Sequence, residues 1–334
     1  MRCTDKQPRG ALKKRTLLAV VTALAFLLTG CGQPQYDMRY TADSEVSSFR
    51  IVSLGAEQRT AEAFAAGLCV VGSDIASEDV DMSNAVGAGL FDVNRQKTLY
   101  AKNVHERLYP ASLTKVMTAL VAMENGTNDM RLTASANVKI TESGAQLAGI
   151  KEGDQMTLDQ ALHLLLINSA NDVAVMIAEG IAGSVDGFTD MMNQKALSLG
   201  ATNTHFANPH GLSDEEHYTT VYDMYLIMNE AVKYALFNEI IHMDSYNTVY
   251  TDRNGNSKDI TVKNTNRYIQ GDFQPPSGIT VLGGKTGTTS AAGSCLVLIS
   301  RDSSGNPYIS VIMRADSSDF LYSQMTDLLE EINK

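Results

Sequence analysis

The sequence has few of the residues that build metal sites or disulfide frameworks. Its six histidines are scattered, and no His-x-x-x-His pair or His/Cys cluster has metal-ligand spacing. Of four cysteines, Cys3 and Cys31 lie near the N-terminus, which leaves Cys69 and Cys295. These two could pair in an oxidising compartment, but Cys295 stands in an apolar strand-like run that favours a buried thiol. We therefore expect a chemistry that needs no metal or other cofactor.

Positive charge is scarce beyond the first thirty residues. Residues 1–30 hold six of the 27 Lys and Arg residues and one of the 38 acids, so residues 31–334 carry 21 basic and 37 acidic side chains, a formal charge of −16. Such a surface repels polyanions. Neither nucleic acid nor anionic lipid is an expected partner of this part of the chain.

A long membrane-spanning run is also missing. The apolar stretch Leu17–Leu28 is shorter than the roughly twenty residues that a spanning helix needs. It follows Lys13-Lys14-Arg15, which is typical of an export signal. Its ending, Leu28-Thr29-Gly30-Cys31, resembles a bacterial lipobox, which implies cleavage before Cys31 and a lipid on its sulfur. An ordinary or uncleaved signal is the alternative.

These features predict the organisation of the chain. Residues 1–30 are a lipoprotein signal peptide, 31–59 a polar tether, and 60–334 one domain held outside the cytoplasm on a lipid anchor. Strand patterns occur at 84–91, 98–101, 280–288, 294–300 and 308–314, and helix patterns between 110 and 234 and after Ser317. The prediction is an α+β fold with one antiparallel sheet formed by both ends and a central helical lobe.

The most informative stretch follows Pro110, which marks a helix start. Ser112 and Lys115 are three residues apart, so their side chains lie on one helix face, a hydroxyl beside an amine. Alone, Ser-x-x-Lys is a common pattern, and a helix lysine is usually solvated. Partners elsewhere in the chain must support a catalytic interpretation.

Two further motifs follow in order: Ser169-x-Asn171, between two apolar helix patterns, and Lys285-Thr286-Gly287 in a strand pattern. Ser135-x-Asn137 and Ser304-x-Asn306 match the second motif too, but they lie in polar, turn-like segments. The set Ser-x-x-Lys, Ser-x-Asn and Lys-Thr-Gly is that of penicillin-binding proteins and serine β-lactamases. We therefore predict that these three segments meet around Ser112.

From about Ala85 to Ala315 the sequence resembles the D-alanyl-D-alanine carboxypeptidases among the low-molecular-mass penicillin-binding proteins. The phrases that carry the resemblance are 109–115, 164–172, 206–212, 264–266 and 284–293. A β-lactamase/transpeptidase-like fold is implied. We expect two departures from the family pattern: no separate C-terminal β-domain and no C-terminal amphipathic anchor. A lipid on Cys31, at the other end of the chain, is expected to replace that anchor.

The resemblance implies a role for each site residue. Ser112 forms an acyl-ester with peptidoglycan stem peptides, Lys115 takes its proton as a neutral amine, and Ser169 relays that proton to the departing D-alanine. Substrate-binding roles fall to Asn171, Lys285, Thr286, Gly287 and Thr288. The backbone N–H groups of Ser112 and Thr288 form the oxyanion hole, and Thr288 or Arg314 takes the terminal carboxylate. For Arg314, a surface strand residue is the favoured interpretation. β-Lactams are expected covalent inhibitors.

Two alternatives remain. A β-lactamase needs a second base, typically in a Glu-x-x-Leu-Asn loop, and no such phrase follows Asn171. A lipid-anchored penicillin-binding sensor would have kept the pocket and lost turnover, against which the complete motif set argues. His210 is not expected to act as a triad histidine, because no Gly-x-Ser-x-Gly elbow is present.

Overall fold

The structure is a computed structural model, and it describes residues 65–334. The predicted signal peptide (1–30), the predicted lipidation site Cys31 and the predicted tether (31–59) lie outside the described residues. Within the described part, no helix is both long and apolar enough to cross a membrane.

Strands from both ends of the described chain form one antiparallel sheet, in the order β2–β1–β9–β8–β7. Its strands are β1 (Ala85–Asp92), β2 (Lys97–Lys102), β7 (Thr280–Thr289), β8 (Gly293–Arg301) and β9 (Pro307–Ala315). Leu90 of β1 lies opposite Ser310 of β9, so the two ends of the domain are joined by strand pairing. The predicted sheet is confirmed, with β7 at one edge.

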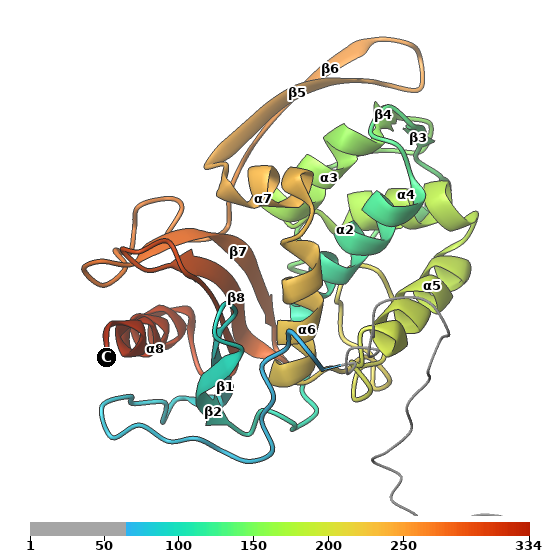
Figure 1. Ribbon diagram of the computed structural model, residues 1–334. Helices are drawn as coiled ribbons and strands as arrows, with labels where there is room; N and C mark the ends of the chain where they lie inside the picture. Colours follow the sequence, from blue (N-terminus) through green and yellow to red (C-terminus); the bar gives the residue numbers. More distant parts are fainter. Residues whose placement is uncertain (1–64) are drawn as a thin grey trace, which may run out of the picture. The chain divides into compact units, whose positions relative to one another are not determined.

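Helices cover both faces of this sheet (Figure 1). Leu296 and Leu298 of β8 pack in the cluster that holds α8 (Ser318–Glu330), whereas Val297 and Ile299 belong to the larger helical core. Successive side chains of a strand point to opposite faces. The sequence of β8 is a continuous apolar run because each face of the strand packs against its own hydrophobic core.

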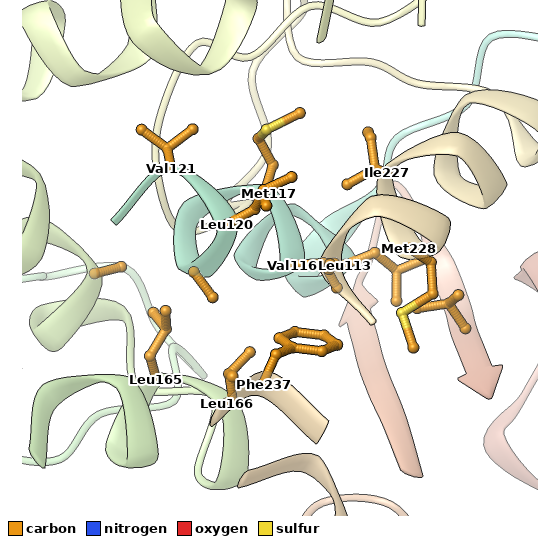
Figure 2. Close-up of a cluster of buried hydrophobic side chains, with 14 of the residues drawn as sticks. Leu113, Val116, Met117, Leu120, Val121, Leu165, Leu166, Ile227, Met228 and Phe237 are labelled. Atoms are coloured by element: carbon orange, nitrogen blue, oxygen red, sulfur yellow. The ribbon is translucent and has the colours of Figure 1, made fainter. Parts of the chain in front are cut away.

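The helical lobe is built around α2. Its helices are α2 (Thr114–Asn125), α3 (Leu158–Ile167), α4 (Asn171–Ala182), α5 (Val185–Ser198), α6 (Val221–Ala231) and α7 (Ala235–His242). Figure 2 shows Met117 and Leu120 of α2 among side chains of its neighbours, with Leu166 from α3 and Phe237 from α7. A helix that is apolar nearly all round must be central. The Ser112 turn is therefore anchored to a buried element.

The junctions of the lobe follow from local sequence. Thr157 caps α3 by accepting from the Gln160 N–H at 3.2 Å, and the Gln160 side chain accepts from the Thr157 N–H at 2.9 Å. This reciprocal capping box stabilises the first turn. The expectation of a helix start there is confirmed, and α3 ends three residues before α4 begins, which leaves a tight turn at Ser169.

The expectation of a single sheet was incomplete, because a second sheet lies beside the lobe. It runs β3–β4–β5–β6, from β3 (Arg131–Thr133), β4 (Gln155–Thr157), β5 (Ser245–Thr251) and β6 (Ser257–Lys263). Its first two strands have three residues each, too short for a periodic signal. The β5–β6 hairpin extends past the helices (Figure 1), and only Val262 within it is buried. A hairpin with little apolar burial leaves little trace in a sequence pattern.

Candidate active site

Ser112 lies in a tight turn at the head of α2. The 3₁₀ turn η2 (Ala111–Leu113) leads directly into the helix. Ala111 has a φ of +47°, a left-handed conformation that is rare for a residue with a side chain. A Cβ atom at Gly211 would lie 1.9 Å from Ala111 O, and one at Gly287 would lie 2.9 Å from Ser112 N. The Ser112 turn is thus enclosed by two backbone segments that only glycine allows so close.

The Lys115 side chain is fully buried one turn further along α2, and its amine has three partners. Nζ lies 2.9 Å from Ser112 Oγ, 2.6 Å from Asn171 Oδ1 and 2.5 Å from His210 O. Burial lowers the pKa of Lys115 well below its ordinary value. The positive charge of Lys285 lowers this pKa further, and the carboxylate of Asp172 opposes the change.

The partners of Lys115 determine where its lone pair points. Asn171 Oδ1 and His210 O can only accept hydrogen bonds, so they take the two N–H groups of a neutral amine. The third position, toward Ser112 Oγ, is then left to the lone pair. A neutral Lys115 is therefore placed to receive the proton of the Ser112 hydroxyl.

Ser169 lies in the turn between α3 and α4. Its φ of +62° is left-handed, and such strain persists only where the surroundings fix the backbone. One such constraint is the hydrogen bond from Asn171 N to Gln146 O at 2.8 Å. The side chain of Ser169 is 5% exposed and lines the same cavity as Ser112.

Asp172 fastens a loop onto this turn. Its Oδ1 accepts from Ala148 N at 2.9 Å, and its Oδ2 accepts from Gly149 N at 2.7 Å and Ile150 N at 3.1 Å. Burial raises the pKa of the carboxyl, while these N–H donors favour the charged form. The fastened loop carries Gln146 on the cavity wall.

The edge strand β7 supplies the opposite wall. Lys285 is 1% exposed, its Nζ donates to Thr286 O at 2.8 Å, and burial lowers its pKa to about 7. The hydroxyls of Thr286 and Thr265 are 2.6 Å apart. Thr265 belongs to a segment that the resemblance included without giving it a role.

One cavity of about 310 Å³ collects most of the predicted site. Six predicted site residues line it: Ser112, Ser169, Asn171, Thr286, Gly287 and Thr288. Lys115 and Lys285 are buried and do not form its wall. Arg314 is exposed at the end of β9 and does not line the cavity, whereas Arg267, which sequence reasoning missed, does. The alternative Ser-x-Asn matches at 135 and 304 lie elsewhere.

The two remaining cysteines are buried free thiols, so they form no disulfide. The Sγ of Cys69 donates to Asp92 O, and the Sγ of Cys295 lies 3.4 Å from Arg314 N. Within residues 65–334, no group of three or more His, Cys, Asp and Glu side chains is arranged to hold a metal ion.

The family profile of D-alanyl-D-alanine carboxypeptidases matches residues 74–317, which include all of these motifs. This chain belongs to that family. Among its relatives, DacF of Bacillus subtilis is 35% identical over 252 residues, covering 74% of this chain and 61% of DacF. DacB2 of Mycobacterium tuberculosis is 32% identical over 203 residues, covering 60% of this chain and 65% of DacB2. The chain thus spans less than two thirds of the length of these curated D-alanyl-D-alanine carboxypeptidases.

Solved structures show the same architecture. The Streptomyces K15 DD-transpeptidase superposes with a TM-score of 0.69 at 27% identity, covering 75% of this chain and 98% of that one. A penicillin-binding protein homologue from Mycobacterium tuberculosis superposes with a TM-score of 0.68 at 25% identity, covering 78% of this chain and 96% of the homologue. The α+β transpeptidase-like fold expected of this D-alanyl-D-alanine carboxypeptidase family member is therefore confirmed.

Proposed function

We propose that this member of the D-alanyl-D-alanine carboxypeptidase family is itself a serine carboxypeptidase that removes the terminal D-alanine from peptidoglycan pentapeptides. The observation that carries the proposal is the buried amine of Lys115. It lies 2.9 Å from Ser112 Oγ, and its other two partners are acceptors. This arrangement supplies the base that a serine nucleophile needs.

In the proposed acylation step, Ser112 Oγ attacks the carbonyl between the two terminal D-alanines and passes its proton to Lys115. Ser169 relays that proton to the departing amine as the C–N bond breaks. Free D-alanine leaves, and the rest of the peptide is held as an ester on Ser112. Water then attacks the ester carbonyl, the bond to Ser112 Oγ breaks, and the shortened peptide leaves with a new carboxyl end while a proton from the water returns to Oγ.

The substrate is proposed to lie along β7. Gly287 permits its close approach, and Thr286 and Lys285 supply a hydroxyl and a positive charge near the terminal carboxylate, which Thr288 also faces. Asn171 uses its oxygen on Lys115, so only its NH₂ group is assigned to the peptide backbone. The N–H groups of Ser112 and Thr288 are the proposed oxyanion hole, with each donor contributing about 3–4 kcal/mol.

β-Lactams are proposed to acylate the same hydroxyl and to be released slowly. A β-lactamase, the principal alternative, would need a second base beside the ester. Of the side chains that line the cavity, none is a carboxylate. This favours a long-lived adduct over rapid β-lactam hydrolysis. The non-catalytic sensor, the other alternative, would form the adduct and release no D-alanine.

We further propose that the enzyme is exported and held on the outer side of the cytoplasmic membrane by a lipid on Cys31. The support is the lipobox-like sequence 28–31 after a basic and apolar leader. Labelled palmitate should enter the wild-type protein and not Cys31→Ala. Labelling of both forms, or of neither, would contradict the anchor.

The function is tested by incubating purified protein with a muropeptide pentapeptide and measuring free D-alanine. We expect release by the wild type and none by Ser112→Ala. Tetrapeptide joined to an added amine acceptor, with D-alanine released, would indicate transfer instead of hydrolysis. Penicillin labelling without D-alanine release would favour the sensor.

A further inference from the structure

His217 is a buried titratable residue to which the proposed mechanism gives no role. It is 1% exposed. In the sequence it lies between Gly211, which lines the cavity, and the start of α6. Its Nδ1 lies 3.0 Å from Ala207 N, and its Nε2 lies 2.7 Å from Thr114 Oγ1. His217 therefore links a loop to the first residue of the nucleophile helix.

The hydrogen-bond partners determine the tautomer of this ring. A backbone N–H can only donate, so Nδ1 must accept from Ala207 and carries no proton. A neutral imidazole then has its proton on Nε2 and donates it to Thr114 Oγ1. Burial lowers the pKa of His217 to about 4, so the ring is neutral at pH 7.

Thr114 passes the interaction on to the nucleophile turn. Its hydroxyl accepts from His217 and has one proton of its own, which it donates to Ala111 O at 2.8 Å. Ala111 is the residue with φ +47° that immediately precedes Ser112. The chain His217, Thr114, Ala111 thus ends on the peptide bond that joins Ala111 to the nucleophile.

Two further bonds attach the same loop to the same helix. Thr118 Oγ1 donates to Pro209 O at 2.6 Å, and Lys115 Nζ contacts His210 O at 2.5 Å. These contacts hold the loop against α2, but neither reaches the Ala111 carbonyl. Of these loop-to-helix contacts, the one through His217 is directed at the strained peptide itself.

We propose that His217, in its Nε2–H form, is a positioning residue that fixes the Ala111 peptide through Thr114 and so sets the direction of Ser112 Oγ for acylation. The inference rests on the proposed function, because it assigns His217 a part in the acyl transfer at Ser112. It concerns the chemical step and not the affinity for the substrate.

Two substitutions separate the roles of the two ring nitrogens. His217→Gln can place an N–H donor near the position of Nε2, whereas His217→Asn can only supply an acceptor near Nδ1. Thr114→Val removes the connecting hydroxyl at constant shape, and Thr114→Ser keeps it. His205→Gln, at a partly buried residue that pairs with Tyr218 in an isolated β-bridge, is the matched histidine control.

The experiment measures benzylpenicillin acylation by rapid quench and mass spectrometry, which gives the rate constant at saturation and the dissociation constant of the non-covalent complex. We expect His217→Asn and Thr114→Val to lower the rate constant about tenfold, with the dissociation constant within about twofold. His217→Gln, Thr114→Ser and His205→Gln should stay within about threefold of the wild type. The double variant His217→Asn/Thr114→Val should be no slower than either single variant.

A wild-type rate in His217→Asn, or an equal loss in His217→Gln and His217→Asn, would overturn the inference. If His217→Asn does not fold, the acylation rate constants of Thr114→Val and Thr114→Ser are compared instead. Equal rate constants for these two variants would overturn the inference. Failure of the proposed function is a separate result. It would show as wild-type protein that is acylated by penicillin and releases no D-alanine from the pentapeptide.

Discussion

The Nζ atom of Lys115 lies 2.9 Å from the Oγ atom of Ser112, inside a shell that excludes solvent from the lysine. Burial and the neighbouring Lys285 both lower the pKa of the amine. The pair therefore has the geometry of a nucleophile with its base already in place.

The lowered pKa of Lys115 has a consequence for stability. Between that pKa and the ordinary value of 10.5, the unfolded chain binds a proton at Lys115 and the folded chain does not, so this residue makes stability rise with pH. Lys115→Met should remove up to about 1.4 kcal/mol per pH unit from that slope. Urea unfolding at pH 7, 8 and 9 measures it, with exposed Lys258→Met as control. If the unfolding free energy changes with pH by the same slope in the wild type and in Lys115→Met, the result would contradict a neutral buried amine.

Lys285 should influence the pH dependence of acylation. Its positive charge lowers the pKa of Lys115, so Lys285→Met should raise that pKa. In the proposed mechanism only neutral Lys115 accepts the Ser112 proton, so the acidic limb of the acylation rate should move to higher pH. The maximal rate should also fall, because the proposed contact of Lys285 with the carboxylate is lost. The pH profile of benzylpenicillin acylation checks this. A limb that moves to lower pH would show that Lys285 acts otherwise on the base.

Gly211 and Gly255 allow a matched test of the close approach to Ala111. Both have left-handed φ angles, +88° and +83°. A Cβ at Gly211 would lie 1.9 Å from Ala111 O, whereas one at Gly255 meets no atom within 4 Å. Gly255→Ala should cost about 1 kcal/mol of stability and leave acylation unchanged. Gly211→Ala should lower stability by more than this and slow acylation at least tenfold. Equal stability losses and equal acylation rates in the two variants would rule out the predicted enclosure of Ala111.

Asp172 should control the loop that forms one wall of the cavity. In Asp172→Asn an NH₂ group would face donors now bound to a carboxylate oxygen, Gly149 N and Ile150 N. We expect a loss of about 2–4 kcal/mol in unfolding free energy and faster amide exchange at residues 148–150. Exposed Asp190→Asn should change neither. Unchanged exchange in Asp172→Asn would mean that other contacts hold the loop.

The sequence predicted those parts of the fold that have strong periodic burial. The strands β8 and β9 are apolar on both faces, and α3 has a complete capping box, so both were recognisable without coordinates. The hairpin β5–β6 was missed because most of its side chains face solvent. The predicted helix at 221–234 corresponds to α6, and the short helix α7, which begins at Ala235, was missed.

The site was predictable where chemistry alone selects a residue type. Two serines, two lysines, an asparagine, a threonine and a glycine, in three short motifs, predicted the segments that meet. Residues that act through packing gave no such signal. His217 lies in an acidic, turn-like stretch, and only the folded chain shows its bonds to Ala207 and Thr114. Asn171 was assigned to the substrate, yet its oxygen binds Lys115.

The most direct test of the central claim is peptide mapping by mass spectrometry after treatment with benzylpenicillin. We predict one covalent penicilloyl group, found on the peptide that contains Ser112, and no adduct in Ser112→Ala or Lys115→Met. An adduct on another residue, or undiminished labelling of Lys115→Met, would contradict the claim that this serine is activated by this amine.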